Sequence, residues 1–215
     1  MRRSPAARSG AAPCPRPKHG ERQATDGTER LGTMAGRLGF LGRFWHSRFT
    51  WPAEMRAVFG HLADHRAERI LQLGLPAVDR TVKLLKAAAG GDTARIHFVG
   101  LDLFESRGPD DPPGPTLKEA HRRLAGLGRV QLVPGVIDAS LSRLCNHLGS
   151  FDLVLVSPGS TTSDRCWLFI QRLAHRQSAV FEQTATDGDG EAAWALVPAG
   201  VIDQRARRAL GRRAA

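Results

Sequence analysis

A carboxylate at the end of an apolar run is the side chain of this chain best placed to bind a ligand. Asp102 follows the stretch RIHFVGL, whose apolar character is typical of a buried strand. In a sheet of parallel strands, ligands bind beside the carboxyl ends of the strands. A carboxylate there can accept hydrogen bonds from the two hydroxyls of a ribose. The alternative is a surface aspartate that caps a loop, and position alone leaves both roles open.

Three more segments follow predicted strands and should reach the same edge of the sheet. They are residues 73–77, 135–138 and 157–160. The first has a single glycine, Gly74, and continues with Leu75 and Pro76, where a nucleotide-binding loop usually carries further glycines. Because proline has no backbone N–H and a fixed φ, this loop can turn at Gly74 but has fewer donors to offer a ligand.

The elements that must position these segments alternate along the chain. Strands are expected at 69–74, 95–104, 129–135, 151–157, 178–183 and 192–198. Helices are expected after Trp51 and at 78–89, 116–128, 138–149 and 162–176, with a polar helix or a frayed tail at 203–213. The alternation predicts an α/β fold, a Rossmann-like three-layer sandwich with a mostly parallel sheet and an antiparallel final strand.

Composition divides the chain into a body and two basic ends. The net charge is +10, of which the first 33 residues carry +4 and the last twelve carry +5. We therefore expect a disordered basic extension at 1–33, one Rossmann-like domain at 34–203 and a basic tail at 204–215. Met34 opens the more structured part, so translation could also start there instead of at Met1.

The near-neutral body argues against several classes of protein. It shows no basic stripe interleaved with aromatic residues, so no specific nucleic-acid partner is expected. No run approaches the length of a membrane span, and the first 33 residues lack the apolar core of a secretory signal, so a cytoplasmic location without a membrane partner is expected. Three scattered cysteines provide neither a disulfide framework nor a metal site. The sequence leaves the oligomeric state open.

Two stretches of the body carry a family resemblance. FVGLDLFESR, followed by a Pro/Gly loop and a helix, and then VQLVPGVIDASLSRL, resemble the class I S-adenosylmethionine-dependent methyltransferases, and among them the macrocin-type sugar O-methyltransferases. That branch typically has a strand ending in G-x-D-x-F-E and a later strand ending in glycine. The resemblance covers about residues 68–182. The matching positions are Gly100, Asp102, Phe104, Glu105, Gly135, Asp138, Ser140 and Leu141.

The resemblance implies a cofactor, S-adenosylmethionine, and a set of residues that bind it. Asp102 would bind the ribose, with Leu103 as an apolar neighbour of the adenine. Val136 and Ile137 would line the adenine pocket. Gly74 would be the glycine of the first loop. Gln72 stands where such enzymes usually have an acid in the first strand.

No metal is expected. The segment VSPGSTTSD after the fourth strand has hydroxyls but no acid before Asp164, and hydroxyls alone bind hard cations poorly. His61 and His65 are four residues apart on a predicted helix, but they lack an evident third ligand, which favours a surface pair.

Two functions follow from these observations. The first is methyl transfer from S-adenosylmethionine to an unknown small-molecule substrate, with no catalytic base that can be named. The second is a non-catalytic Rossmann-like module for binding or interaction. Gln72, Pro76 and the missing acids after the fourth strand favour this second function.

Overall fold

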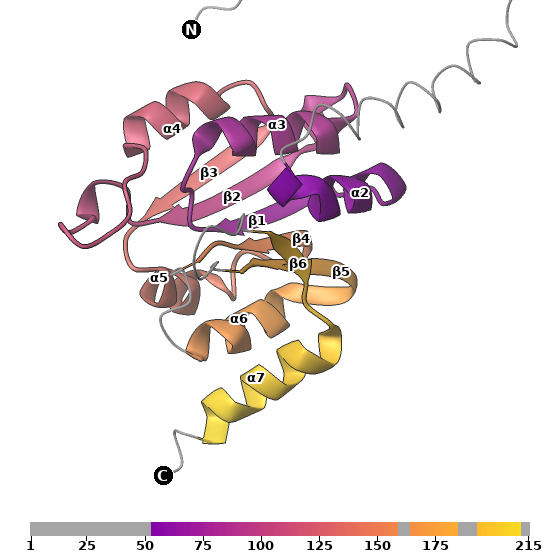
Figure 1. Ribbon diagram of the computed structural model, residues 1–215, viewed down its shortest axis with the longest axis vertical. Coiled ribbons are helices and arrows are strands. Elements are labelled where there is room, and N and C mark those ends of the chain that lie inside the picture. Colours follow the sequence, from indigo (N-terminus) through magenta and orange to yellow (C-terminus); the bar gives the residue numbers. More distant parts are fainter. Residues whose placement is uncertain (1–52, 159–163, 185–192, 212–215) are drawn as a thin grey trace, which may run out of the picture. The chain divides into compact units, whose positions relative to one another are not determined.

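The computed structural model describes residues 53–158, 164–184 and 193–211 (Figure 1). The chain divides into two units, residues 1–40 and 41–215, and every described residue belongs to the second. The predicted extension at 1–33 and the alternative start at Met34 lie outside the described residues. The proposed domain limits therefore remain a prediction.

A six-stranded sheet forms the centre of the described part. Its strands are β1 (Arg69–Leu73), β2 (His97–Asp102), β3 (Arg129–Pro134), β4 (Phe151–Val156), β5 (Ala174–Gln183) and β6 (Trp194–Leu196). Their order is β3-β2-β1-β4-β5-β6, with β6 antiparallel to β5 and all other pairs parallel. This is the doubly wound Rossmann order, so the predicted fold class is confirmed, including the antiparallel final strand.

Helices cover both faces of the sheet (Figure 1). One face carries α2 (Arg56–Asp64), α3 (Val78–Ala89) and α4 (Leu117–Leu124), and the other carries α5 (Ile137–Leu144), α6 (Arg165–Leu173) and α7 (Ala199–Gly211). Three short 3-10 helices lie at Ala53–Met55, Thr93–Arg95 and Phe104–Ser106. None of the described helices combines the length and apolar character that a membrane span requires.

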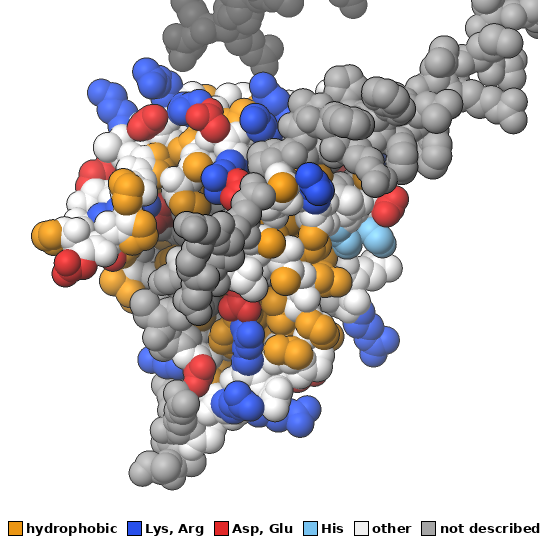
Figure 2. Space-filling model, viewed as in Figure 1, with side chains coloured by type: hydrophobic (Ala, Val, Ile, Leu, Met, Phe, Trp, Pro, Cys, Tyr) orange, Lys and Arg blue, Asp and Glu red, His pale blue; other side chains and the backbone are white. Residues whose placement is uncertain are grey.

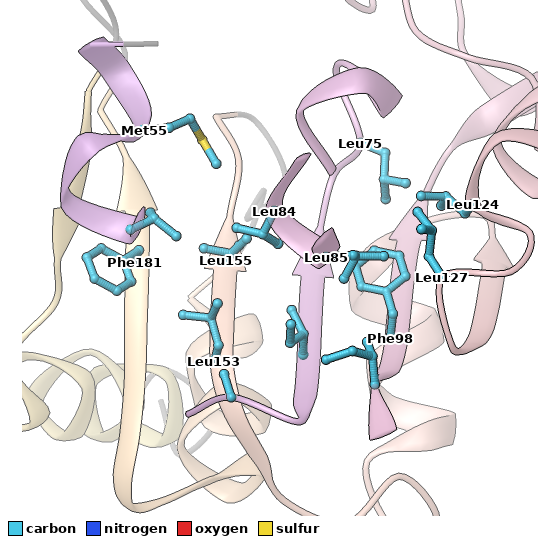
Figure 3. Close-up of a cluster of buried hydrophobic side chains, with 14 of the residues drawn as sticks. Met55, Leu75, Leu84, Leu85, Phe98, Leu124, Leu127, Leu153, Leu155 and Phe181 are labelled. Carbon is cyan, nitrogen blue, oxygen red and sulfur yellow. The ribbon is translucent and has the colours of Figure 1, made fainter. Parts of the chain in front are cut away.

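The strands β1, β2, β4 and β5 send alternate side chains into two separate cores. In β1, Ile70 packs in the cluster under α2, α3 and α4, whereas Leu71 packs in the cluster under α5, α6 and α7. Figure 3 shows the first cluster, in which Phe98 from β2 and Leu85 from α3 are both fully buried. Because both faces of the central strands are buried, their sequences are continuous apolar runs, which explains why they could be recognised.

Several elements differ from their predicted limits. The helices expected at 116–128 and 138–149 already end at Leu124 and Leu144. The helix expected at 162–176 ends at Leu173, and β5 begins at once with Ala174, which pairs with Phe151. A local hydrogen bond stabilises this early start, since the His175 N–H donates to Ser178 Oγ. At the other end, α7 begins at Ala199 and runs past residue 203, so Arg205, Arg207 and Arg208 belong to a helix that packs on α6.

Basic side chains are spread over the visible face of the described part. Figure 2 shows lysine and arginine side chains distributed around this face and mixed with acidic ones, without a single basic patch. Several basic groups are paired, among them Arg80 with Glu54 and Arg205 with Glu182. The expectation that the protein has no specific nucleic-acid partner remains a prediction.

Gly128, just before β3, should tolerate no side chain. Its φ is +111°, and a Cβ there would lie 2.4 Å from the Ile96 carbonyl oxygen. Gly128→Ala is therefore expected to lower the free energy of unfolding by about 2 kcal/mol in urea denaturation. Gly126→Ala is the matched control, because Gly126 also has a positive φ but open space around its Cβ position. Equal losses in the two variants would contradict the steric part of this prediction.

Asp152, at the start of β4, predicts a pH-dependent contribution to stability. Burial raises its pKa, but the backbone N–H of Arg69, the His175 side chain and the N–H of Glu68 outweigh burial and lower it from the ordinary value of 3.8. A carboxyl whose pKa is lower in the folded state stabilises the fold above its unfolded pKa, and this contribution is lost as the pH falls through the lower folded value.

Asp152→Asn should consequently cost about 1 kcal/mol of unfolding free energy at pH 7, and less as the pH falls below 3.8. Urea denaturation of both proteins between pH 7 and pH 3 measures this difference. A difference that stays constant over that range would show that the charge of Asp152 plays no part.

Candidate functional site

A cavity of about 360 Å³ opens at the carboxyl ends of the central strands. It lies at the point where the strand order reverses, because β1 pairs with β2 on one side and with β4 on the other. Doubly wound sheets bind their ligands at this point, and the volume falls within the usual range for small-molecule sites. Its lining includes Gly74, Leu75, Pro76, Arg80, Asp102, Leu103, Arg107, Asp111, Val136, Ile137, Ser157 and Gln183.

Five of the six residues predicted to bind the cofactor line this cavity. They come from the ends of three strands: Gly74 follows β1, Asp102 ends β2 and Leu103 follows it, and Val136 and Ile137 follow β3. The structure thus brings together residues that are more than 60 positions apart in the sequence. That they bind a cofactor remains a prediction.

Gln72, the sixth residue, has a different environment. Its side chain is buried and lines a separate cavity of about 10 Å³ beside α3. Its Nε2 donates to the Gly74 carbonyl over 3.1 Å, and its Oε1 accepts from Thr81 Oγ1 over 3.0 Å. Gln72 therefore does not line the main cavity, but it fixes the carbonyl of Gly74, which does line it.

The Gly74 turn is fixed entirely by protein groups. Gly74 has a φ of +80°, its N–H donates to the Leu101 carbonyl, and its own carbonyl accepts from Gln72 and from Ser157 Oγ at 3.0 Å. Residues 73–77 and 157–160 were expected at the same edge of the sheet, and the pairing of β4 with β1 brings Ser157 into contact with this turn. These bonds hold one conformation without the extra glycines of a nucleotide-binding loop.

Leu75 explains why the second position of the loop is not a glycine. Its side chain is fully buried in the cluster of Figure 3, and the residue also lines the cavity. Room for it comes from Gly100 in β2, where a Cβ would lie 3.1 Å from Leu75 Cδ1. The glycine that appeared in the strand motif thus accommodates a core side chain of the neighbouring loop.

Asp102 is the centre of a hydrogen-bond network at the cavity. The residue is only 5% exposed. Its Oδ2 accepts from the Leu75 N–H at 3.0 Å and from Arg107 Nη2 at 2.5 Å, and its Oδ1 accepts from the Leu103 N–H at 2.7 Å. Asp102 is therefore not a surface residue, but it does hold two loops as well as line the cavity.

Arg107 was not among the predicted site residues. It forms an ion pair with Asp102 in which the two side chains are 15% and 7% exposed. Its Nη1 donates to the carbonyls of Phe104 and Pro115 at 3.1 and 3.2 Å. The only signal in the sequence was a basic residue in the loop five positions after the carboxylate.

Apolar side chains form another part of the lining. Val136 is 57% exposed although it is a large apolar residue, and it lies at the N-cap of α5 beside the buried Ile137. Leu103 is half-buried at the end of β2. An exposed valine next to a cavity provides a contact for an apolar part of a ligand, since burying it would remove apolar area from water.

Potential metal ligands do not gather in the described part of the chain. No group of three or more histidine, cysteine, aspartate or glutamate side chains lies close enough there to hold an ion. His61 and His65 stack with their ring centroids 4.3 Å apart. Burial and the neighbouring His65 lower the pKa of His61.

Comparison with known proteins gives no close relative. No family model and no curated protein matches the chain. Among solved structures it is similar to a putative caffeoyl-CoA O-methyltransferase from Staphylococcus aureus, with 12% identity, 70% of this chain and 66% of that chain covered, and a TM-score of 0.46. For cofactor-bound Rv0187 from MTB the identity is 20%, the covered shares are 85% and 78%, and the TM-score is 0.46.

A third similar structure is a putative protein-L-isoaspartate O-methyltransferase from Plasmodium falciparum in complex with S-adenosyl-L-homocysteine. Its identity is 13%, 67% of each chain is covered, and the TM-score is 0.44. At such identities the likeness is distant. The strand order alone places this chain among the Rossmann-like α/β folds, and its function has to be inferred from the residues at the cavity.

Proposed function

We propose that the cavity binds S-adenosylmethionine and that the protein is a methyltransferase acting on a small-molecule substrate. One observation carries the proposal: a buried carboxylate, a glycine turn and an apolar surface, from the ends of three neighbouring strands, line one cavity at the switch point of the sheet. These features suit a nucleoside: the carboxylate accepts from the ribose, the glycine turn lets the ligand approach the protein backbone closely, and the apolar surface contacts the base.

Each feature corresponds to one part of the cofactor. Asp102 accepts a hydrogen bond from the ribose, Val136 and Ile137 contact the adenine, and the Gly74 turn leaves room for the part that carries the methyl group. When bound, S-adenosylmethionine supplies an electrophilic methyl group for in-line displacement. The chain's own residues orient the cofactor and exclude water from the apolar part of the cavity.

The second candidate is a non-catalytic binding module, and it also has an observation in its favour. The Leu75 N–H is engaged by Asp102 and Pro76 has no N–H, so the first loop offers few backbone donors to a ligand. Such a protein would keep the sheet and the cavity and would bind neither S-adenosylmethionine nor its product.

Calorimetric titration of the full chain with S-adenosylmethionine and S-adenosylhomocysteine separates the two candidates. The methyltransferase is expected to bind both with one site per chain and to unfold at a higher temperature in their presence. An absence of heat and of thermal shift at millimolar ligand would eliminate it. Incubation with methyl-labelled cofactor and a small-molecule extract should then yield a labelled small molecule, which a binding module cannot form.

A further inference from the structure

The Asp102 carboxylate already uses most of its hydrogen-bond acceptor positions within the protein. Its Oδ2 accepts two hydrogen bonds, from Leu75 and Arg107, whereas its Oδ1 accepts one, from Leu103. Since a carboxylate oxygen offers about two acceptor positions, one position remains on Oδ1. A ribose has two neighbouring hydroxyls, so Asp102 alone cannot accept from both while Arg107 stays in place.

Arg107 has the complementary capacity. A guanidinium carries five N–H groups, of which Arg107 uses two on Nη1 for the Phe104 and Pro115 carbonyls and one on Nη2 for Asp102. The other Nη2 proton and the Nε proton have no acceptor among the described residues, and Arg107 lines the cavity. The pair thus presents one free acceptor position and at least one free donor.

The loop after β2 is shaped to keep the guanidinium there. Gly114 lies against the guanidinium, and a Cβ there would be 2.3 Å from Arg107 Cζ, so a larger residue would require the guanidinium to shift. The ion pair with Asp102 is largely shielded from solvent, which makes it stronger than an exposed pair. Arg107 is therefore held in place before any ligand arrives.

We propose that Arg107 is a specificity-determining residue that recognises the ribose jointly with Asp102. One ribose hydroxyl donates to Asp102 Oδ1, and its neighbour accepts from an N–H of Arg107. This inference rests on the proposed function, because it assumes a nucleoside ligand. Recognition by Asp102 alone would require only that one ribose hydroxyl donates a hydrogen bond. With Arg107, the ligand must also present a neighbouring hydroxyl that accepts one.

The test compares three ligands on three proteins by calorimetry. The ligands are S-adenosylhomocysteine and its 2′-deoxy and 3′-deoxy analogues, and the proteins are the unchanged chain, Arg107→Ala and Arg122→Ala. Arg122 is an exposed arginine of α4 outside the cavity lining and serves as the matched control. In the unchanged chain, each deoxy analogue should bind about 10-fold more weakly than the parent.

Arg107→Ala should abolish the penalty for one of the two deoxy analogues and leave the other in place, whereas Arg122→Ala should keep both. A purely structural role of Arg107 would weaken all three ligands by the same factor, and this result would overturn the inference, as would tighter binding of the parent to Arg107→Ala. If thermal unfolding shows that Arg107→Ala does not fold, Arg107→Lys takes its place, because its ammonium keeps the charge but cannot make the same set of bonds. Failure of the unchanged chain to bind the parent would instead refute the proposed function.

Discussion

Asp102→Asn is expected to lower the free energy of unfolding by about 3 kcal/mol, because it breaks a buried ion pair and leaves the Arg107 guanidinium without its counter-charge. The asparagine side chain has one oxygen where the carboxylate has two. The hydrogen bond from the N–H of either Leu75 or Leu103 is therefore also weakened. Urea denaturation measures this loss directly.

The same variant should weaken S-adenosylhomocysteine binding by at least about tenfold, since the amide is a poorer acceptor for a ribose hydroxyl. Asp110→Asn is the matched control, because Asp110 is an exposed aspartate of the following loop. A stability loss below about 1 kcal/mol would mean that the ion pair does not hold the two loops. Unchanged affinity in a folded Asp102→Asn protein would separate Asp102 from ligand binding.

Leu75→Ala is the second substitution with a large expected effect. The side chain is fully buried between the first loop and Gly100, and its truncation leaves a cavity in the core under α3 and α4. Replacing a buried leucine with alanine typically lowers the free energy of unfolding by about 3 kcal/mol, and we expect a loss of this size for Leu75→Ala. Leu196→Ala, at a position 57% exposed on β6, should cost less than about 1 kcal/mol in the same urea experiment.

Similar losses in the two leucine variants would show that Leu75 is not a core residue. The substitution Gly100→Ala tests the packing of this region as a whole, because its Cβ would lie 3.0 to 3.1 Å from the side chains of Phe98, Leu132 and Leu75. It should also destabilise the fold, by about 1–3 kcal/mol.

The sheet could be predicted because its central strands are continuous apolar runs separated by glycine and proline. Strands such as Phe151–Val156 are buried on both faces, so the pattern of residues reports directly on the environment. The start of β5 was missed, because Ala174, His175 and Arg176 continue the polar and apolar spacing of the helix before them. Pairing with β4, and not local propensity, decides their conformation.

Some residues of the site could be predicted from the sequence and others could not. Asp102, Gly74 and Val136 could be predicted because a general rule places ligands at the ends of parallel strands. Arg107 could not, since it acts through a contact that exists only after folding, its pair with Asp102. Ser157 lies in a segment that the same rule placed at this edge, but its bond to the Gly74 carbonyl was not predicted. The same holds for Leu75, whose partner Gly100 lies on the neighbouring strand.

The network around Asp102 has a consequence for how this chain can change over evolutionary time. Because the carboxylate holds Leu75, Leu103 and Arg107, selection for a stable fold alone would preserve it, whether or not the protein binds a nucleoside. Val136 has no such protection, since most of its surface is exposed and its loss costs the fold little. Position 136 is therefore where relaxed selection would first become visible, and an apolar residue maintained there across orthologues would be the signature of a cavity still in use.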